Sequence, residues 1–230
     1  MAGGGNNVAR MSPRQRMINL MYIVLTAMLA LNVSSDVLNG FSQVHDSISR
    51  TNKNIAERNA AQFRYLESLY QESPQKAGEW YAKGDDLRKR SLSLFNTIED
   101  LKVQIAVAAD GKGADYHDLN NLDDLEASSV TMLNPGTQKG KKLREAIEAY
   151  RSYVVELIPD PTKKKAVYEM LSTEIVKKAG GPSSWEQKNF ENMPAVAAVT
   201  MLTKLQNDIH QAESEALSNL IMNVDMDDVH

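Results

Sequence analysis

The chain has 230 residues, of which 42% are hydrophobic and 24% are charged. This composition contains too many core-forming side chains for a disordered or collagen-like protein. The net charge of −4 argues against nucleic acid as a partner. Because the sequence has no cysteine, disulfides, thiolate metal sites and cysteine nucleophiles are excluded from it.

The charge is distributed unevenly along the chain. Residues 1–35 contain three arginines and no acidic residue, whereas the remainder has 23 basic and 30 acidic residues. The stretch MINLMYIVLTAMLALNVSS, residues 17–35, has no charged side chain, and as a helix it would be roughly 28 Å long, enough to cross a bilayer core. The preceding arginines predict a cytoplasmic N-terminus and an inner-membrane, single-pass topology, with the bulk of the chain in the periplasm.

The start of this helix is marked by a capping box. Ser12 and Gln15 have the S-x-x-Q spacing, and Pro13 occupies the first helical position. We therefore expect a cytoplasmic tail over residues 1–12 and a transmembrane helix over residues 13–36. The alternative interpretation is a cleaved signal peptide, for which Val33-Ser34-Ser35 would be a tolerable cleavage site.

Two arginines lie in the first turn of the predicted helix, where the helix dipole disfavours a cation by up to about 1 kcal/mol. Anionic lipid headgroups are the favoured compensation for Arg16. The alternative compensation is a carboxylate on a partner helix. Helical phase places Arg14 on one stripe with Ile18, Leu25 and Asn32.

Polar side chains within the span point to packing against other protein. Such groups are costly in lipid and normally face protein or water. The residues expected to make these intramembrane contacts are Asn19, Tyr22, Thr26 and Asn32.

The rest of the chain is predicted to be an all-α, elongated bundle over residues 37–224. Apolar residues continue at helical spacing from the span to about Glu72, on a seam that also contains His45, Asn52 and Asn59. Because this seam is too polar for an autonomous coiled coil, we expect a dimer in which residues 38–69 form much of the contact. The other predicted helices span residues 74–108, 139–158, 161–179 and 194–222, with an irregular excursion over 110–140 that holds a short helix or a hairpin, and a short turn from Ser183.

Motifs for catalysis are missing from the sequence. It has no P-loop, GxGxxG, HExxH or GxSxG pattern, and its four histidines are scattered along the chain. We expect neither an enzyme, nor a metal site, nor a cofactor.

Two long segments resemble one protein family. SPRQRMINLMYIVLTAMLALNVSSDVLNGF, residues 12–41, is similar to the N-terminus of the GldM/PorM proteins of gliding motility and type IX secretion. GGPSSWEQKNFENMPAVAAVTMLTKLQNDI, residues 180–209, resembles the end of the first periplasmic domain of that family. The chain lacks the β-rich domains that follow in the family, so residues 225–230 are expected to be the end of a truncated chain.

The resemblance implies a motor subunit. In the family, two copies of the membrane helix stand inside a ring of five GldL/PorL-type multi-span subunits. Proton flow drives rotation, and the full-length protein delivers it to periplasmic and outer-membrane secretion components. The arginine of the family that faces a ring glutamate corresponds to Arg14. The alternative function is a membrane-tethered helical protein that is structural or senses a ligand, without a motor role.

Overall fold

The computed structural model describes residues 12–226, apart from the side chains of residues 25–34. The chain divides into two compact units, Met1–Gly40 and Phe41–His230. Every regular element among the described residues is a helix, which confirms the all-α part of the predicted fold class. The helices are α1 Pro13–Glu72, α2 Pro74–Asp110, α3 Glu126–Met132, α4 Lys139–Val155, α5 Pro161–Met170, α6 Trp185–Phe190 and α7 Ala195–Met226.

Part of the predicted membrane span lies outside the described side chains. No helix within the part so described is long and apolar enough to cross a bilayer. The predicted transmembrane helix 13–36 includes residues 25–34 and remains a prediction.

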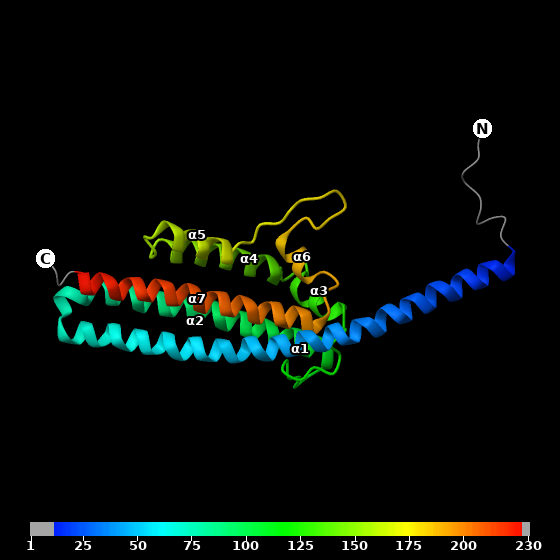
Figure 1. The fold of residues 1–230 in the computed structure, drawn as a ribbon, viewed down its shortest axis with the longest axis horizontal. Helices are drawn as coiled ribbons and strands as arrows, with labels where there is room; N and C mark the ends of the chain where they lie inside the picture. Colours follow the sequence, from blue (N-terminus) through cyan, green and yellow to red (C-terminus); the bar gives the residue numbers. More distant parts are fainter. Residues whose placement is uncertain (1–11, 227–230) are drawn as a thin grey trace. The chain divides into compact units, whose positions relative to one another are not determined.

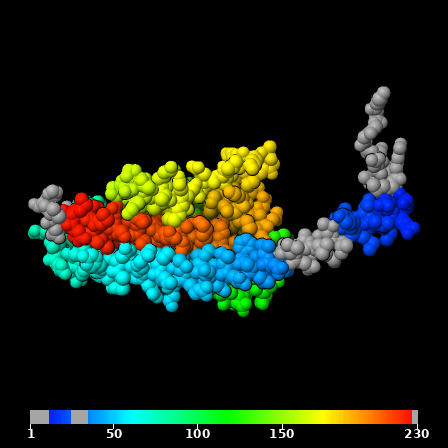
Figure 2. Space-filling view, viewed as in Figure 1, coloured from blue at the N-terminus to red at the C-terminus, as the bar shows by residue number. Residues whose placement is uncertain are grey.

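The second unit is a bundle whose long helices run side by side (Figure 1). Residues 41–72 of α1, together with α2 and α7, form one layer, and α4 and α5 pack on it. In the space-filling view, residues 41–72 and α7 lie against each other along their length (Figure 2). Buried side chains recur on α2 at near-heptad spacing. These are Ala77, Gly84, Leu87, Ser91, Leu94, Ile98, Leu101 and Ile105.

The polar seam of α1 is buried within the chain, which corrects its predicted role as a dimer interface. The Asn52 side-chain amide donates to the Thr203 carbonyl at 3.1 Å, and the Asn59 amide donates to the His210 carbonyl at 2.9 Å. Leu66, on the same face, is fully buried. The polar residues that recur along this face of α1 therefore contact α7 of the same chain. They do not need a second copy of the chain to cover them.

The predicted helix over 161–179 is too long, because α5 ends at Met170. The Ser172 hydroxyl accepts a hydrogen bond from the Glu174 backbone N–H, and the Thr173 hydroxyl donates to the Glu148 carboxylate at 2.7 Å. These side-chain bonds compete with helical ones. The β-branched pair Ile175-Val176 that follows further lowers the helix propensity.

The excursion after α2 contains a short helix, α3, and no hairpin among its described residues. Helix α2 ends at Asp110 and is followed by Gly111, whose φ of 93° suits glycine. The Asp110 carboxylate then accepts the backbone N–H groups of Asn120 and Asn121 at 2.7 and 2.9 Å. The Asp110 side chain thus holds the loop after α2 against the end of the helix.

Gly140 and Gly78 give a matched test of packing. A Cβ built at Gly140 would lie 2.8 Å from the Met132 carbonyl oxygen and 2.8 Å from Glu186 Cβ, whereas at Gly78 the nearest atom is 3.7 Å away. Both glycines are helical, so alanine favours the helix at each by up to about 1 kcal/mol. We expect Gly78→Ala to raise the free energy of unfolding and Gly140→Ala to lower it by about 1–3 kcal/mol, measured by urea denaturation. Equal effects of the two substitutions would contradict this packing.

Candidate functional site

The N-terminal residues singled out in the sequence lie at the start of α1. The Ser12 hydroxyl accepts a hydrogen bond from the Gln15 backbone N–H at 3.2 Å. The Gln15 side chain does not return to Ser12; its amide donates to Asn19 Oδ1 at 3.2 Å. Ser12 therefore satisfies one of the free N–H groups of the first turn, and Gln15 links that turn to the next.

The other residues predicted to pair with a partner or to pack within the membrane also lie on α1. Arg14 and Tyr22 are exposed and Asn19 is half-buried. Thr26 and Asn32 lie outside the described side chains, so the structure does not test whether these groups share a packing face.

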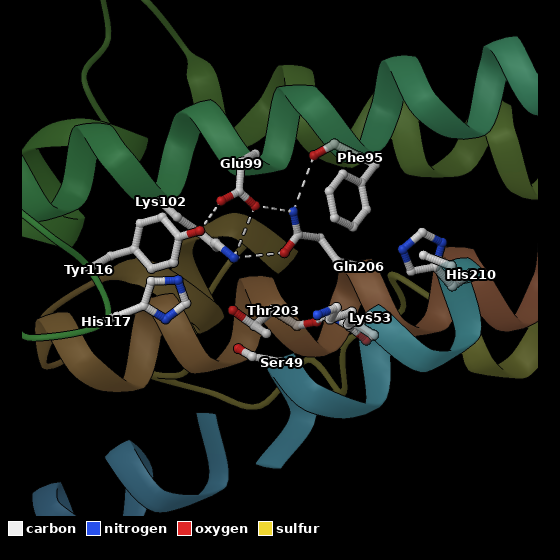
Figure 3. A pocket seen from close by; sticks show the side chains of 12 residues that line it. Ser49, Lys53, Phe95, Glu99, Lys102, Tyr116, His117, Thr203, Gln206 and His210 are labelled. Atoms are coloured by element: carbon white, nitrogen blue, oxygen red, sulfur yellow. Dashed lines mark hydrogen bonds and ion pairs between the residues drawn. The ribbon is translucent and has the colours of Figure 1, made fainter. Parts of the chain in front are cut away.

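The second unit holds a buried polar cluster at the interface of α2 and α7 (Figure 3). The Lys102 ammonium donates to Gln206 Oε1 at 2.8 Å and lies 3.1 Å from the Glu99 carboxylate. The Gln206 amide donates in turn to Glu99 at 2.7 Å and to the Phe95 carbonyl at 3.2 Å. The three side chains thus form a closed ring of interactions across two helices.

Tyr116, from the loop after α2, covers this ring. Its hydroxyl donates to Glu99, and the Lys102 ammonium lies 4.3 Å from the centre of its aromatic ring. A cation over an aromatic face is attracted by the ring quadrupole. The loop is therefore tied to α2 through both members of the charge pair.

Burial sets the electrostatics of the cluster. Burial lowers the pKa of Lys102, and the nearby Glu99 charge only partly counteracts it. For Glu99, burial acts to raise the pKa, but hydrogen bonds from Gln206 and Tyr116 and the charge of Lys102 outweigh it and bring the pKa below its ordinary value. Burial and the hydrogen bond to Glu99 both raise the pKa of the Tyr116 phenol.

Two histidines that are far apart in sequence meet beside this cluster. The rings of His45, on α1, and His117, in the loop after α2, have centroids 5.2 Å apart. His45 is 3% exposed, and its Nε2 has no hydrogen-bond partner. Burial, with the charges of Lys102 and His117, lowers the pKa of His45. No sequence pattern predicts this pair, because tertiary folding and no local motif brings the two histidines together.

A cavity of about 280 Å³ lies next to the cluster, between α1, α2 and α7. Its lining includes Glu99, Lys102, Tyr116, His117 and Gln206 (Figure 3). Because Glu99, Lys102 and Gln206 bond to one another, their main role is to lock the helices together.

The charge pair predicts an asymmetric response to mutation. The Lys102 side chain is 4% exposed and that of Glu99 is 33% exposed. Glu99→Ala leaves a buried ammonium without its counter-charge and should cost on the order of 2–3 kcal/mol, somewhat below the loss for a fully buried pair. Lys102→Met keeps the packing volume and leaves a carboxylate that reaches water, so it should cost less than about 1.5 kcal/mol. Urea denaturation of both variants checks this order, and a larger loss for Lys102→Met would contradict it.

Glu99 also predicts a pH dependence. Since its pKa in the folded state lies below the ordinary 4.5, the unfolded chain binds the proton first as the pH falls. The stabilisation that ionised Glu99 contributes is therefore fully present above about pH 4.5 and is lost as the pH falls through its folded-state pKa. Between about pH 6 and pH 3, Glu99→Gln should lose less unfolding free energy than the unsubstituted chain.

Glu57→Gln, which removes an exposed glutamate of α1, is the control for this measurement. It should follow the unsubstituted chain across the pH range. If the Glu99→Gln curve also runs parallel to that of the unsubstituted chain, the assigned role of Glu99 is wrong.

Comparison with known proteins identifies the family. The family model described as the GldM N-terminal domain matches residues 36–223, which is more than half of the chain. A comparison with curated proteins gives no match. The match begins directly after the uncharged segment and ends within α7, so it covers nearly all of the helical bundle. The chain therefore belongs to the GldM family, part of the gliding-motility and type IX secretion machinery.

Proposed function

We propose that the chain is the central subunit of a proton-driven rotary motor in the bacterial inner membrane, which powers type IX secretion and gliding. The observation that carries this proposal is the match of residues 36–223 to the GldM N-terminal domain. The match directly follows the uncharged segment 17–35, which three arginines precede. The proposed topology has the N-terminus in the cytoplasm and the helical bundle in the periplasm.

The surface of the first turns of α1 supports insertion into a bilayer or among partner helices. Met17, Leu20, Met21 and Ile23 are each exposed by more than 60%. At 100° per residue these four side chains cover an arc of about 160°. The exposed side chains of Ile18 and Tyr22 extend the apolar surface to the other side of the helix. A helix that is apolar on all sides requires an apolar surrounding, which lipid or the transmembrane helices of a partner would supply.

Arg14 is the proposed partner of a carboxylate in the surrounding ring. It lies in the capped first turn, where its own helix dipole disfavours it. No acidic residue occurs before Asp36 in the sequence. A ring carboxylate that is ionised would pair with Arg14, and protonation would release it. Proton binding would thereby change which ring subunit is docked.

The proposed stoichiometry makes this docking unequal. Two central helices inside five equivalent GldL/PorL-type subunits have no common symmetry, so the two cannot occupy equivalent sites at once. The dimer proposed here is one of membrane helices, because the polar seam of α1 is occupied by α7. Protonation of successive carboxylates would then favour stepwise rotation.

The bundle would transmit torque to the secretion components of the periplasm and outer membrane. Polar bonds fix the register of α1 against α7 at intervals along both helices: Asn52 bonds to Thr203, Asn59 to His210, and Gln62 to Ser218 at 3.0 Å. Sliding of one helix along the other would leave these buried groups unpaired. A lever needs this resistance to shear.

The two arginines of the first turn give the decisive test. Arg14→Ala in the full-length protein should abolish gliding and secretion, because an unpaired ring carboxylate in low dielectric costs about 3–5 kcal/mol and is relieved only by protonation. Arg16→Ala is the matched control and should be much milder. Gliding and secretion are scored at matched protein levels, with insertion verified, since Arg10 and the remaining arginine maintain the topology.

Normal function of Arg14→Ala, or greater damage from Arg16→Ala, would refute the role of Arg14. Purification from membranes separates the motor from a simple tether. A small multi-span subunit should copurify in fixed excess over the chain, and a chain that purifies without one would favour the tethered structural or sensing protein.

A further inference from the structure

Three potential metal ligands converge where α1 meets the loop after α2. One ligand atom each from His45, Asp46 and His117 lies within 4.8 Å of the other two. His45 and Asp46 are on α1, and His117 comes from the segment between α2 and α3. We propose that these three side chains form a binding site for a divalent transition metal, of which Zn²⁺ is the best match.

His45 supplies independent evidence for a missing partner. It is 3% exposed, and its Nε2 is buried without a hydrogen-bond partner. Its Nδ1 lies 3.6 Å from the Asp46 carboxylate, longer than an ordinary hydrogen bond. Buried polar atoms are nearly always satisfied, and an ion is one explanation for an exception. The ring is also fixed in place by edge contact with Tyr116, with centroids 5.9 Å apart.

The donor set selects the class of metal. Two imidazoles and one carboxylate suit Zn²⁺ and related borderline ions, whereas Ca²⁺ and Mg²⁺ prefer oxygen ligands only. Asp46 and His117 are exposed, so both have room to approach an ion bound to the fixed His45. Three protein ligands also leave a coordination position for water.

The neighbouring cation does not block the site. The Lys102 ammonium is engaged by Glu99 and Gln206 and lies over the face of Tyr116. Its charge is therefore partly balanced within the cluster. Metal binding would join α1 to the loop after α2, next to the ring contacts of His45 with Tyr116 and His117.

The test is a Zn²⁺ titration of the purified full chain in competition with a chromophoric chelator. We expect saturable binding of one Zn²⁺ per chain, weakened at least tenfold by His117→Gln and by Asp46→Asn. Both replaced residues are exposed, so neither substitution should prevent folding. The matched control is Asp118→Asn, which replaces a carboxylate of the same loop outside the triad and should bind Zn²⁺ as the unsubstituted chain does.

Hydrogen exchange gives a second readout that tests the location of the site. Zn²⁺ should slow exchange of the amides of residues 111–118 in the unsubstituted chain and leave them unchanged in His117→Gln. Zn²⁺ binding of equal affinity in the unsubstituted chain and His117→Gln would overturn the proposal. So would the lack of saturable binding at Zn²⁺ concentrations up to about 0.1 mM.

Discussion

Burial of α7 is the interaction on which the bundle depends. Its first turns are small and β-branched residues, Ala195 to Val199, and every one of them is buried. Small side chains allow neighbouring helices to approach closely, and each buried aliphatic residue contributes about 1–3 kcal/mol relative to exposure. Further along, Leu202, Ile209, Ala216, Leu217 and Leu220 are buried as well. Because residues 41–72 of α1, α2 and α4 all lie against this one helix (Figure 1), α7 is the element that the other long helices share.

Polar groups along α7 determine the register of α1 and α2 against it. Glu213 is 3% exposed and pairs with Arg88 of α2 at 2.7 Å, while Gln206 joins the Glu99–Lys102 pair. Toward α1, the carbonyls of Thr203 and His210 accept from Asn52 and Asn59. An apolar interface tolerates sliding, whereas unpaired buried polar groups are penalised by about 1–3 kcal/mol each. Apolar area therefore supplies the attraction, and the polar bonds select one register.

The sequence predicts the positions of the helices better than it predicts which helices pack against each other. Apolar periodicity located α2 and α7, and turn residues marked the break before α3, because these signals are local. Helix α5 was overextended, since the bond from Thr173 to Glu148 depends on a residue 25 positions away. The spacing of apolar residues on α1 likewise shows that one face of this helix is covered, but it does not identify the covering helix as α7. The cluster of His45, Lys102, Tyr116 and His117 draws on three separate segments, and no spacing rule connects them.

Lys102 and Arg14 are two cationic groups whose charges are balanced in different ways. Lys102 is buried with a carboxylate, an amide oxygen and an aromatic face supplied by its own chain. Arg14 precedes an uncharged segment, and residues 1–35 contain no acid with which to make such a cluster. Under the proposed topology the counter-charge of Arg14 would then come from another subunit. A pair within one chain, such as Glu99–Lys102, stabilises the fold of the bundle. A pair between chains that breaks on protonation can instead select among equivalent partners, which is the property that a stepping motor requires.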